Sequence, residues 1–248
     1  MNQNAKEGKK KSIIFVVMML SIFLVACDSS NSNTTKDNTD TSSTNTTEET
    51  DDVSNEEENV EEPVEETTAP AEVELTAGHY VAGTDFPSGT YNLTARSGQG
   101  NVSSSNMYSG GLNATMGTPA DDLYTETFNN ANFEDGVVLS IGGNLLLNLT
   151  TDAGDSTNVK TREQNGDAVE LSDGNYTAGT DFPAGTYNIA AVNGGGNVSS
   201  DNMFDGGLNE IMGTLDDDMY IAEFKNATFE DGNVLTISGV TVQLVPVN

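Results

Sequence analysis

The chain lacks tryptophan, and it holds one cysteine, one histidine and only nine lysines and arginines against 39 aspartates and glutamates. A single cysteine excludes an internal disulfide and a cysteine-based metal site. The formal net charge is −30 over 248 residues. A surface this acidic repels phosphates, so we expect neither nucleic acid nor anionic lipid headgroups as partners.

The first 26 residues have the pattern of an export signal. Four lysines between positions 6 and 11 give a positive start, and an uncharged, mostly apolar run extends from Ile13 to Ala26. This run is shorter than the ~20 apolar residues that a bilayer span needs, but it has the length of a signal-peptide core. The alternative is an N-terminal membrane anchor with an incidental cysteine.

The run ends in Leu24-Val25-Ala26-Cys27. These four residues resemble the lipobox of bacterial lipoproteins, in which the cysteine receives a diacylglyceryl group and a peptidase cuts before it. The resemblance implies a signal peptide of residues 1–26 and lipid attachment at Cys27. It also implies a lipid-anchored location on the extracellular face of the cell membrane, because two acyl chains suffice for stable anchoring.

Residues 27–74 are predicted to form a disordered acidic tether after the lipidated cysteine. Asp, Glu, Ser, Thr and Asn dominate the segment, and Lys36 is its only basic residue. Apolar residues are too sparse to offset the entropy of ordering the chain. Charge repulsion and two prolines favour extended conformations, which suits a spacer between a membrane and a folded part.

An internal duplication follows the tether. Residues 75–150 align with residues 171–246 at a constant offset of 96, and the blocks 83–92 and 179–188 differ at one position only. Two copies are too few for a stacked solenoid. We therefore predict two small modules that each fold alone, repeat 1 (75–150) and repeat 2 (171–248), joined by a polar linker (151–170).

Each repeat is predicted to be all-β. Apolar residues come in short runs separated by Gly, Pro, Asn and Asp, without a sustained helical period. The strands expected in repeat 1 are His79–Ala82, Thr90–Ala95, Asn101–Asn106, Leu123–Phe128, Val137–Ile141 and Leu145–Leu149. The expected core aromatics are Tyr80, Phe86, Tyr91, Phe128 and Phe133, with Tyr176, Phe182, Tyr187, Phe224 and Phe229 in repeat 2. Asp85 is expected to cap the turn that contains Pro87 and Gly89.

The opening of each repeat carries a recognisable motif. Gly-x-Tyr-x-Ala-Gly-Thr-Asp-Phe-Pro-x-Gly-Thr-Tyr spans Gly78–Tyr91 and again Gly174–Tyr187. The motif resembles that of an uncharacterised β-sandwich-like module of exported Gram-positive proteins. The resemblance implies a β-sandwich-like fold and an extracellular location, and it implies no particular activity.

Enzyme chemistry finds little support in the residues. His79 is the only histidine, and Asn175 takes its place in repeat 2. The adjacent acids at Asp121-Asp122 and Glu134-Asp135 are typical of solvated turns. The segment 201–206 begins like a calcium loop, but Met203 stands at its third position. We therefore expect a non-enzymatic protein that needs no cofactor or metal.

A Gly-, Asn- and Ser-rich block occurs in both repeats, at 100–113 and 196–209. Short polar side chains beside glycine are typical of a hydrogen-bonding recognition surface, and they are equally typical of irregular turns. The sequence thus leaves open two functions, recognition of an envelope or host glycan or protein, and a passive spacer without a ligand. For recognition, the residues expected on one exposed surface are Asn101, Ser103, Asn106, Asn113, Asn197, Ser199, Asn202 and Asn209.

Overall fold

A computed structural model describes residues 68–215 and 217–248. These residues form strands, turns and loops without a helix, which confirms the all-β prediction. Within the same ranges there is accordingly no helix long and apolar enough to cross a membrane. The predicted signal peptide, Cys27 and the predicted tether up to residue 67 lie outside the described residues.

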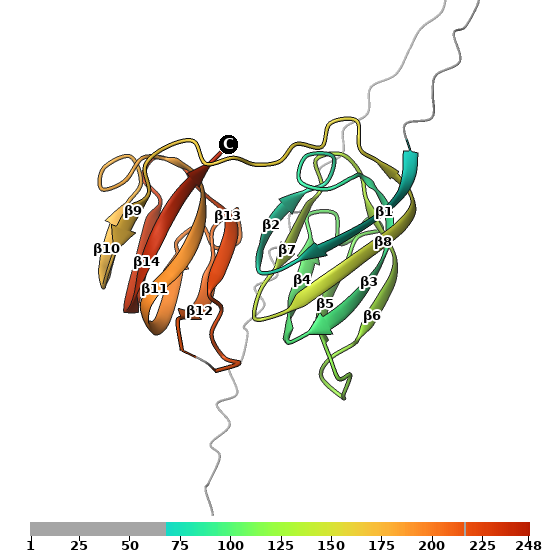
Figure 1. Cartoon of the computed structure of the whole chain (residues 1–248), viewed down its shortest axis with the longest axis horizontal. Helices are drawn as coiled ribbons and strands as arrows, with labels where there is room; N and C mark the ends of the chain where they lie inside the picture. The colour runs from blue at the N-terminus through green and yellow to red at the C-terminus, as the bar shows by residue number, and fades with distance from the viewer. Residues whose placement is uncertain (1–67, 216) are drawn as a thin grey trace, which may run out of the picture. The chain divides into compact units, whose positions relative to one another are not determined.

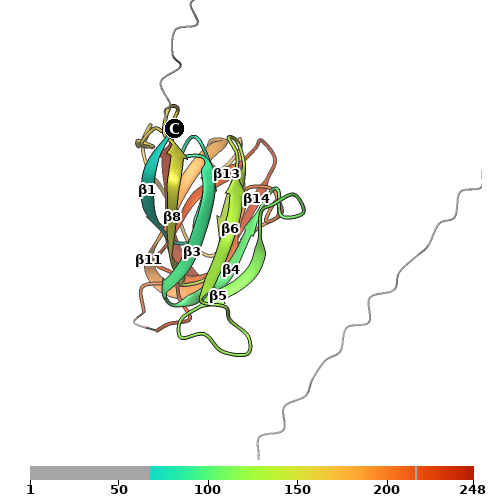
Figure 2. The same cartoon turned by 90° about the vertical axis from the view of Figure 1, so that its right-hand side faces the viewer.

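Repeat 1 folds into two antiparallel layers. One layer has the order β1 (Thr68–Leu75), β8 (Leu146–Asp155), β3 (Gly89–Ser97) and β6 (Thr127–Phe133). Figure 2 shows these four strands side by side in this order. The other layer has the order β2 (Gly78–Val81), β7 (Val138–Ile141), β4 (Gln99–Ser104) and β5 (Asn113–Gly117).

Repeat 2 has the same plan with fewer interruptions. Its strands are β9 (Val169–Leu171), β10 (Gly174–Thr177), β11 (Gly185–Ser200), β12 (Asn209–Gly213), β13 (Glu223–Phe229) and β14 (Val234–Val247). The long strands β11 and β14 lie side by side (Figure 1) and bend so that each serves both layers. The register between them shifts from Gly194 to Asn197, where successive glycines let the two backbones come close.

Each repeat encloses its own apolar cluster. In repeat 1, Phe86, Tyr91 and Phe133 pack with ring centroids 5.8–5.9 Å apart. Phe182, Tyr187 and Phe229 repeat the arrangement. Of the ten aromatics expected in the cores, eight are buried, and Phe128 and Tyr176 are half-buried.

The motif that opens each repeat owes its shape to buried polar contacts. The Tyr91 hydroxyl donates to the Pro87 carbonyl at 2.7 Å. Asp85 does not cap the following turn as expected, because its Oδ2 accepts the N–H of Val81 at 2.7 Å. The same carboxylate also pairs with Arg162 and is 6 % exposed.

Several predicted boundaries were wrong. The last residues of the predicted tether belong to β1, where Ala71, Val73 and Leu75 alternate toward the core and pair with β8. β8 in turn runs five residues into the predicted linker. The predicted strand Leu123–Phe128 begins only at Thr127, because Leu123 is 74 % exposed in a loop. β5 was not predicted, because the pattern of its five residues is too polar to mark a strand.

The sequence offset between equivalent residues of the two repeats changes near their ends. Val102 pairs with Ile141, and Val198 pairs with Ile237, which keeps the offset of 96. Farther on, Leu93 pairs with Leu149 whereas Ile189 pairs with Leu244, so the offset has fallen to 95. The turn after β7 therefore contains one residue more in repeat 1, and Asn144 occupies the extra position.

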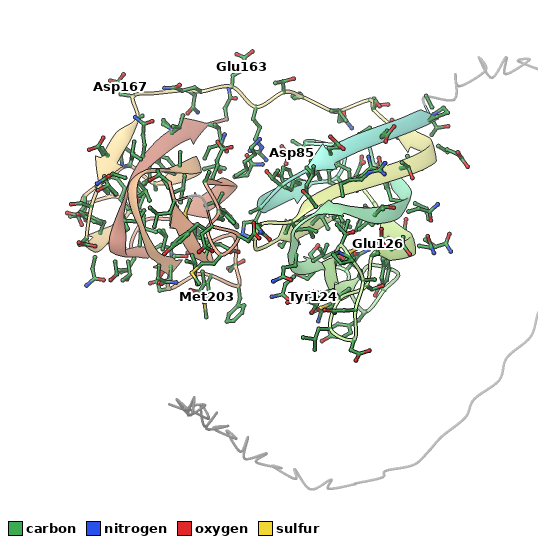
Figure 3. The ribbon with its side chains drawn as sticks, turned by 60° about the horizontal axis from the view of Figure 1, so that its bottom comes forward. Asp85, Tyr124, Glu126, Glu163, Asp167 and Met203 are labelled. Carbon is green, nitrogen blue, oxygen red and sulfur yellow. The ribbon has the colours of Figure 1, made fainter. Side chains whose placement is uncertain are left out.

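The segment between the repeats is bound along its length. The N–H of Lys160 donates to Thr84 of repeat 1, and the N–H of Asn165 donates to Pro246 of repeat 2. Asp85 lies below this segment in Figure 3. Glu163, the neighbour of Arg162 in the segment, points to the opposite side, away from Asp85. Both repeats belong to one compact unit.

Candidate functional site

The repeats meet where β2 runs parallel to β13. The N–H of Lys225 donates to the carbonyl of Ala77 at 3.0 Å, and Gly78 stands in register with Lys225. A Cβ at Gly78 would lie 2.7 Å from the Lys225 oxygen, so the close approach of the two strands requires glycine. The amide of Asn226 also donates to the His79 carbonyl at 2.8 Å. Ala77 is 2 % exposed and belongs to the apolar cluster of repeat 2.

His79 lies in this contact between the repeats. Its Nε2 is 2.6 Å from the Gly207 carbonyl and its Nδ1 is 2.8 Å from Ser140 Oγ. Since a carbonyl only accepts, Nε2 carries the proton and Nδ1 accepts from the serine. The rings of His79 and Phe224 pack in a T-shaped arrangement, with centroids 5.2 Å apart and an interplanar angle of 75°. Burial lowers the pKa of His79, and the bond to the Gly207 carbonyl partly offsets that effect.

Two further polar contacts join the repeats. The Glu210 carboxylate accepts the N–H of Gly143 at 3.1 Å. The Asn144 amide donates to the carbonyl of Asp218 at 2.7 Å. Burial raises the pKa of Glu210, and the bond from Gly143 counteracts part of the rise.

Beside this contact lies a groove, which we call the inter-repeat groove. It consists of a hollow of about 770 Å³ and an adjoining one of about 280 Å³. The outer face of β2, β7, β4 and β5 forms one wall, and the loop 201–208 between β11 and β12 forms much of the other. Met203, labelled in Figure 3, lies on that loop. Serine, threonine and asparagine side chains line the walls together with apolar ones such as Met107, Met203 and Phe204, with a few carboxylates and no lysine or arginine.

The groove brings together five of the eight residues predicted for recognition. They are Asn101, Ser103 and Asn113 from repeat 1, and Asn202 and Asn209 from repeat 2. Asn106, Asn197 and Ser199 lie outside its walls. The expected surface therefore combines unlike parts of the two repeats and is not a pair of identical patches.

Asn106 and Asn202 have a structural role that the prediction of an exposed surface did not foresee. The Asn106 amide donates to the Asn132 carbonyl at 2.7 Å, and its Oδ1 accepts from Ser104. The Asn202 amide donates to the carbonyls of Thr228 and Asp205. Both side chains are half-buried and hold their loop against the neighbouring strand.

The two most exposed aromatic residues in the described part of the chain were not among the residues predicted for recognition. Tyr108 is 92 % exposed and Phe204 is 94 % exposed, at equivalent positions of the repeats. Each follows a partly exposed methionine, Met107 or Met203. Phe204 lines both hollows of the groove, and Tyr108 lines neither. The repeated Met-aromatic pair at the centre of a polar block was the signal that could have marked these positions.

The His79–Ser140 contact resembles the base–nucleophile pair of serine hydrolases, and repeat 2 shows what else such a contact does. There Thr236 donates to Asn175 at 2.8 Å, at the same pair of cross-strand positions. An amide cannot act as a general base, so the contact persists where catalysis is excluded. A cross-strand hydrogen bond accounts for both pairs.

No three His, Cys, Asp or Glu side chains converge to form a metal site within residues 68–215 and 217–248. No known protein family model matches the chain, and comparison with curated proteins gives no match.

Proposed function

We propose that this chain is a membrane-anchored, non-enzymatic surface lipoprotein whose inter-repeat groove recognises an uncharged glycan. The observation that carries the proposal is the composition of the groove, in which hydroxyl and amide side chains lie beside apolar surface that includes the exposed ring of Phe204. Pockets with a few convergent polar groups beside an apolar surface are typical of ligand sites.

The charges of the groove favour an uncharged ligand over an anionic one. Asp205, Glu230 and Glu210 are its ionisable carboxylates, and no lysine or arginine lines it. A phosphorylated or sulfated polymer would leave its anions unpaired beside these carboxylates. A sugar presents hydroxyl edges, which such acceptors and amides bind, and C–H faces, which an exposed aromatic ring covers.

The anchoring half of the proposal rests on the sequence. The lipobox resemblance places lipid on Cys27, which would hold the repeats at the extracellular face of the cell membrane. The acidic segment up to residue 67 would then separate the repeats from that membrane.

A passive spacer is the second candidate function, and one observation favours it. Asn106 and Asn202 bind backbone carbonyls of their own repeat, as scaffold residues do. In that case the retained Asn and Ser residues serve folding alone. The groove itself is the feature that a spacer does not require.

A binding panel tests the proposal. The soluble segment 28–248, which contains every described strand, is titrated against a neutral polysaccharide, a sulfated one and polylysine. We expect saturable binding to the neutral polymer, little change between 50 and 500 mM salt, and none to the sulfated polymer. Binding to polylysine alone would instead identify a cationic partner, and binding to none of the three would favour the spacer.

A further inference from the structure

The two repeats meet through two different strand edges, one from each repeat. Because the repeats are duplicates, an equivalent of each edge occurs a second time in the chain. β2 of repeat 1 docks on β13 of repeat 2. The equivalent of β2 in repeat 2 is β10, which is an edge strand, and the equivalent of β13 in repeat 1 is β6, also an edge strand. A contact between unlike faces that leaves both faces free at its ends generates open chains of molecules.

The backbone features of the contact are present at both free edges. Gly174 stands where Gly78 does, and the two have similar φ angles, 159° and 153°. Asn130 and Asn226 share a left-handed backbone, at φ of 59° and 58°. Phe128 corresponds to Phe224 and is half-buried. The main chain alone would therefore let β10 of one molecule dock on β6 of another.

The side chains differ at the positions that close the contact. Ala77, buried against repeat 2, is replaced by Asp173 in repeat 2. Asp173 is exposed, and its carboxylate accepts the N–H of Gly239. Docking of β10 in the manner of β2 would bury this carboxylate without a cation.

Three cross-repeat hydrogen bonds are also missing from the free edges. Glu210, which accepts the Gly143 N–H, corresponds to Ala114. His79 corresponds to the shorter Asn175. Asn144 occupies the extra position of the repeat 1 turn and has no counterpart.

From these differences we infer that Ala77, His79 and Glu210 form a specificity set that restricts docking to the two repeats of one chain, while Asp173 closes the β10 edge to a second copy. The chain carries one matched pair of faces and one mismatched pair. The protein therefore forms the inter-repeat groove within a single molecule and does not associate into open-ended assemblies of many molecules.

The direct test places the closing residue at the docking position. Ala77→Asp is made in the full chain, which is purified in mild detergent. Thr76→Asp is the control, because Thr76 is exposed and its substitution adds the same charge one residue away. Hydrogen exchange is measured for peptides that contain the Lys225 and Gly143 amides. We expect at least tenfold faster exchange at both in Ala77→Asp only, with the amides around Tyr91 and Tyr187 still protected.

The reciprocal test opens the closed edges. The variant Asp173→Ala/Asn175→His/Ala114→Glu should self-associate, with a mass by light scattering that rises with concentration, while the wild type keeps one molecular mass. Equal exchange in Ala77→Asp and Thr76→Asp would overturn the inference. A triple variant that stays at the mass of the wild type, or a wild type that itself forms chains, would also overturn it.

Discussion

The N–H of Gly143 donates to the carboxylate of Glu210 in the other repeat, at 3.1 Å. The equivalent N–H of Gly239 donates to Asp173 of its own repeat. One repeat thus satisfies this backbone group internally, and the other depends on its neighbour for it. A buried N–H without a partner is costly, so this dependence favours the docked arrangement.

Docking should depend on pH through His79. Burial holds the pKa of His79 below its ordinary value of 6.5. The folded protein favours the neutral imidazole. The stability that His79 contributes is therefore complete above pH 6.5 and is lost as the pH falls from 6.5 toward the lowered pKa. We expect the wild type to lose stability relative to His79→Asn between pH 7.5 and 5.5, as measured by urea unfolding at both values.

Asn is the residue that repeat 2 carries at this position, so the variant suits the fold. Glu210 also faces the contact, but its raised pKa gives a dependence of opposite sign, and both proteins share it. A difference in unfolding free energy that is the same at the two pH values would show that His79 does not titrate in the contact.

Asn202 should matter for stability. Its amide donates to two backbone carbonyls, at 3.1 and 2.8 Å. Loss of such bonds costs about 1–2 kcal/mol, which lowers the melting temperature by about 2–8 °C for a domain of this size. Asn202→Ala should show this decrease in a thermal melt, whereas the exposed Asn113→Ala should stay within about 0.5 kcal/mol of the wild type. Equal melting temperatures would remove the scaffold role of Asn202.

Ser140 should not act as a nucleophile. Its hydroxyl donates to His79 in a cross-strand contact that Thr236 and Asn175 reproduce without a base. A fluorophosphonate probe labels activated serines. We expect it to give no more label on the wild type than on Ser140→Ala. Label that disappears in Ser140→Ala would identify a hydrolase and refute the non-enzymatic assignment.

Lipid attachment at Cys27 is tested by labelling with a fatty-acid probe. Cys27→Ala should abolish the label and leave the precursor uncut by the lipoprotein peptidase, because both steps need the thiol. Cells that express the unchanged chain serve as the control. Equal label in both would contradict the lipobox assignment.

The sequence was sufficient for the class of fold and for most of the core. The glycines and prolines of the opening motif fix a turn chemistry that permits few alternatives, and Tyr91 and Phe133 are buried as expected. β1 was missed because acidic residues on its exposed side mask the alternation of Ala71, Val73 and Leu75. The antiparallel pairing of β1 with β8 makes these residues a regular strand, and this pairing could not be predicted from composition.

The site was only partly predictable for a different reason. The polar block was identified, but whether Asn106 points outward or binds the Asn132 carbonyl depends on a strand 26 residues away. The groove itself arises from docking between the repeats. Its determinants, such as Glu210 and Gly143, are 67 residues apart and have no local pattern.

The central claim is that the inter-repeat groove binds an uncharged glycan through Phe204. Calorimetric titration of segment 28–248 with a neutral polysaccharide tests it most directly, in the wild type, Phe204→Ala and Tyr108→Ala. Tyr108 is the matched control, because it is equally exposed at the equivalent position but does not line the groove. We predict that Phe204→Ala weakens binding at least tenfold, about 1.4 kcal/mol, and that Tyr108→Ala changes it less than about twofold. Equal affinities of the two variants, or no binding by the wild type, would contradict the account.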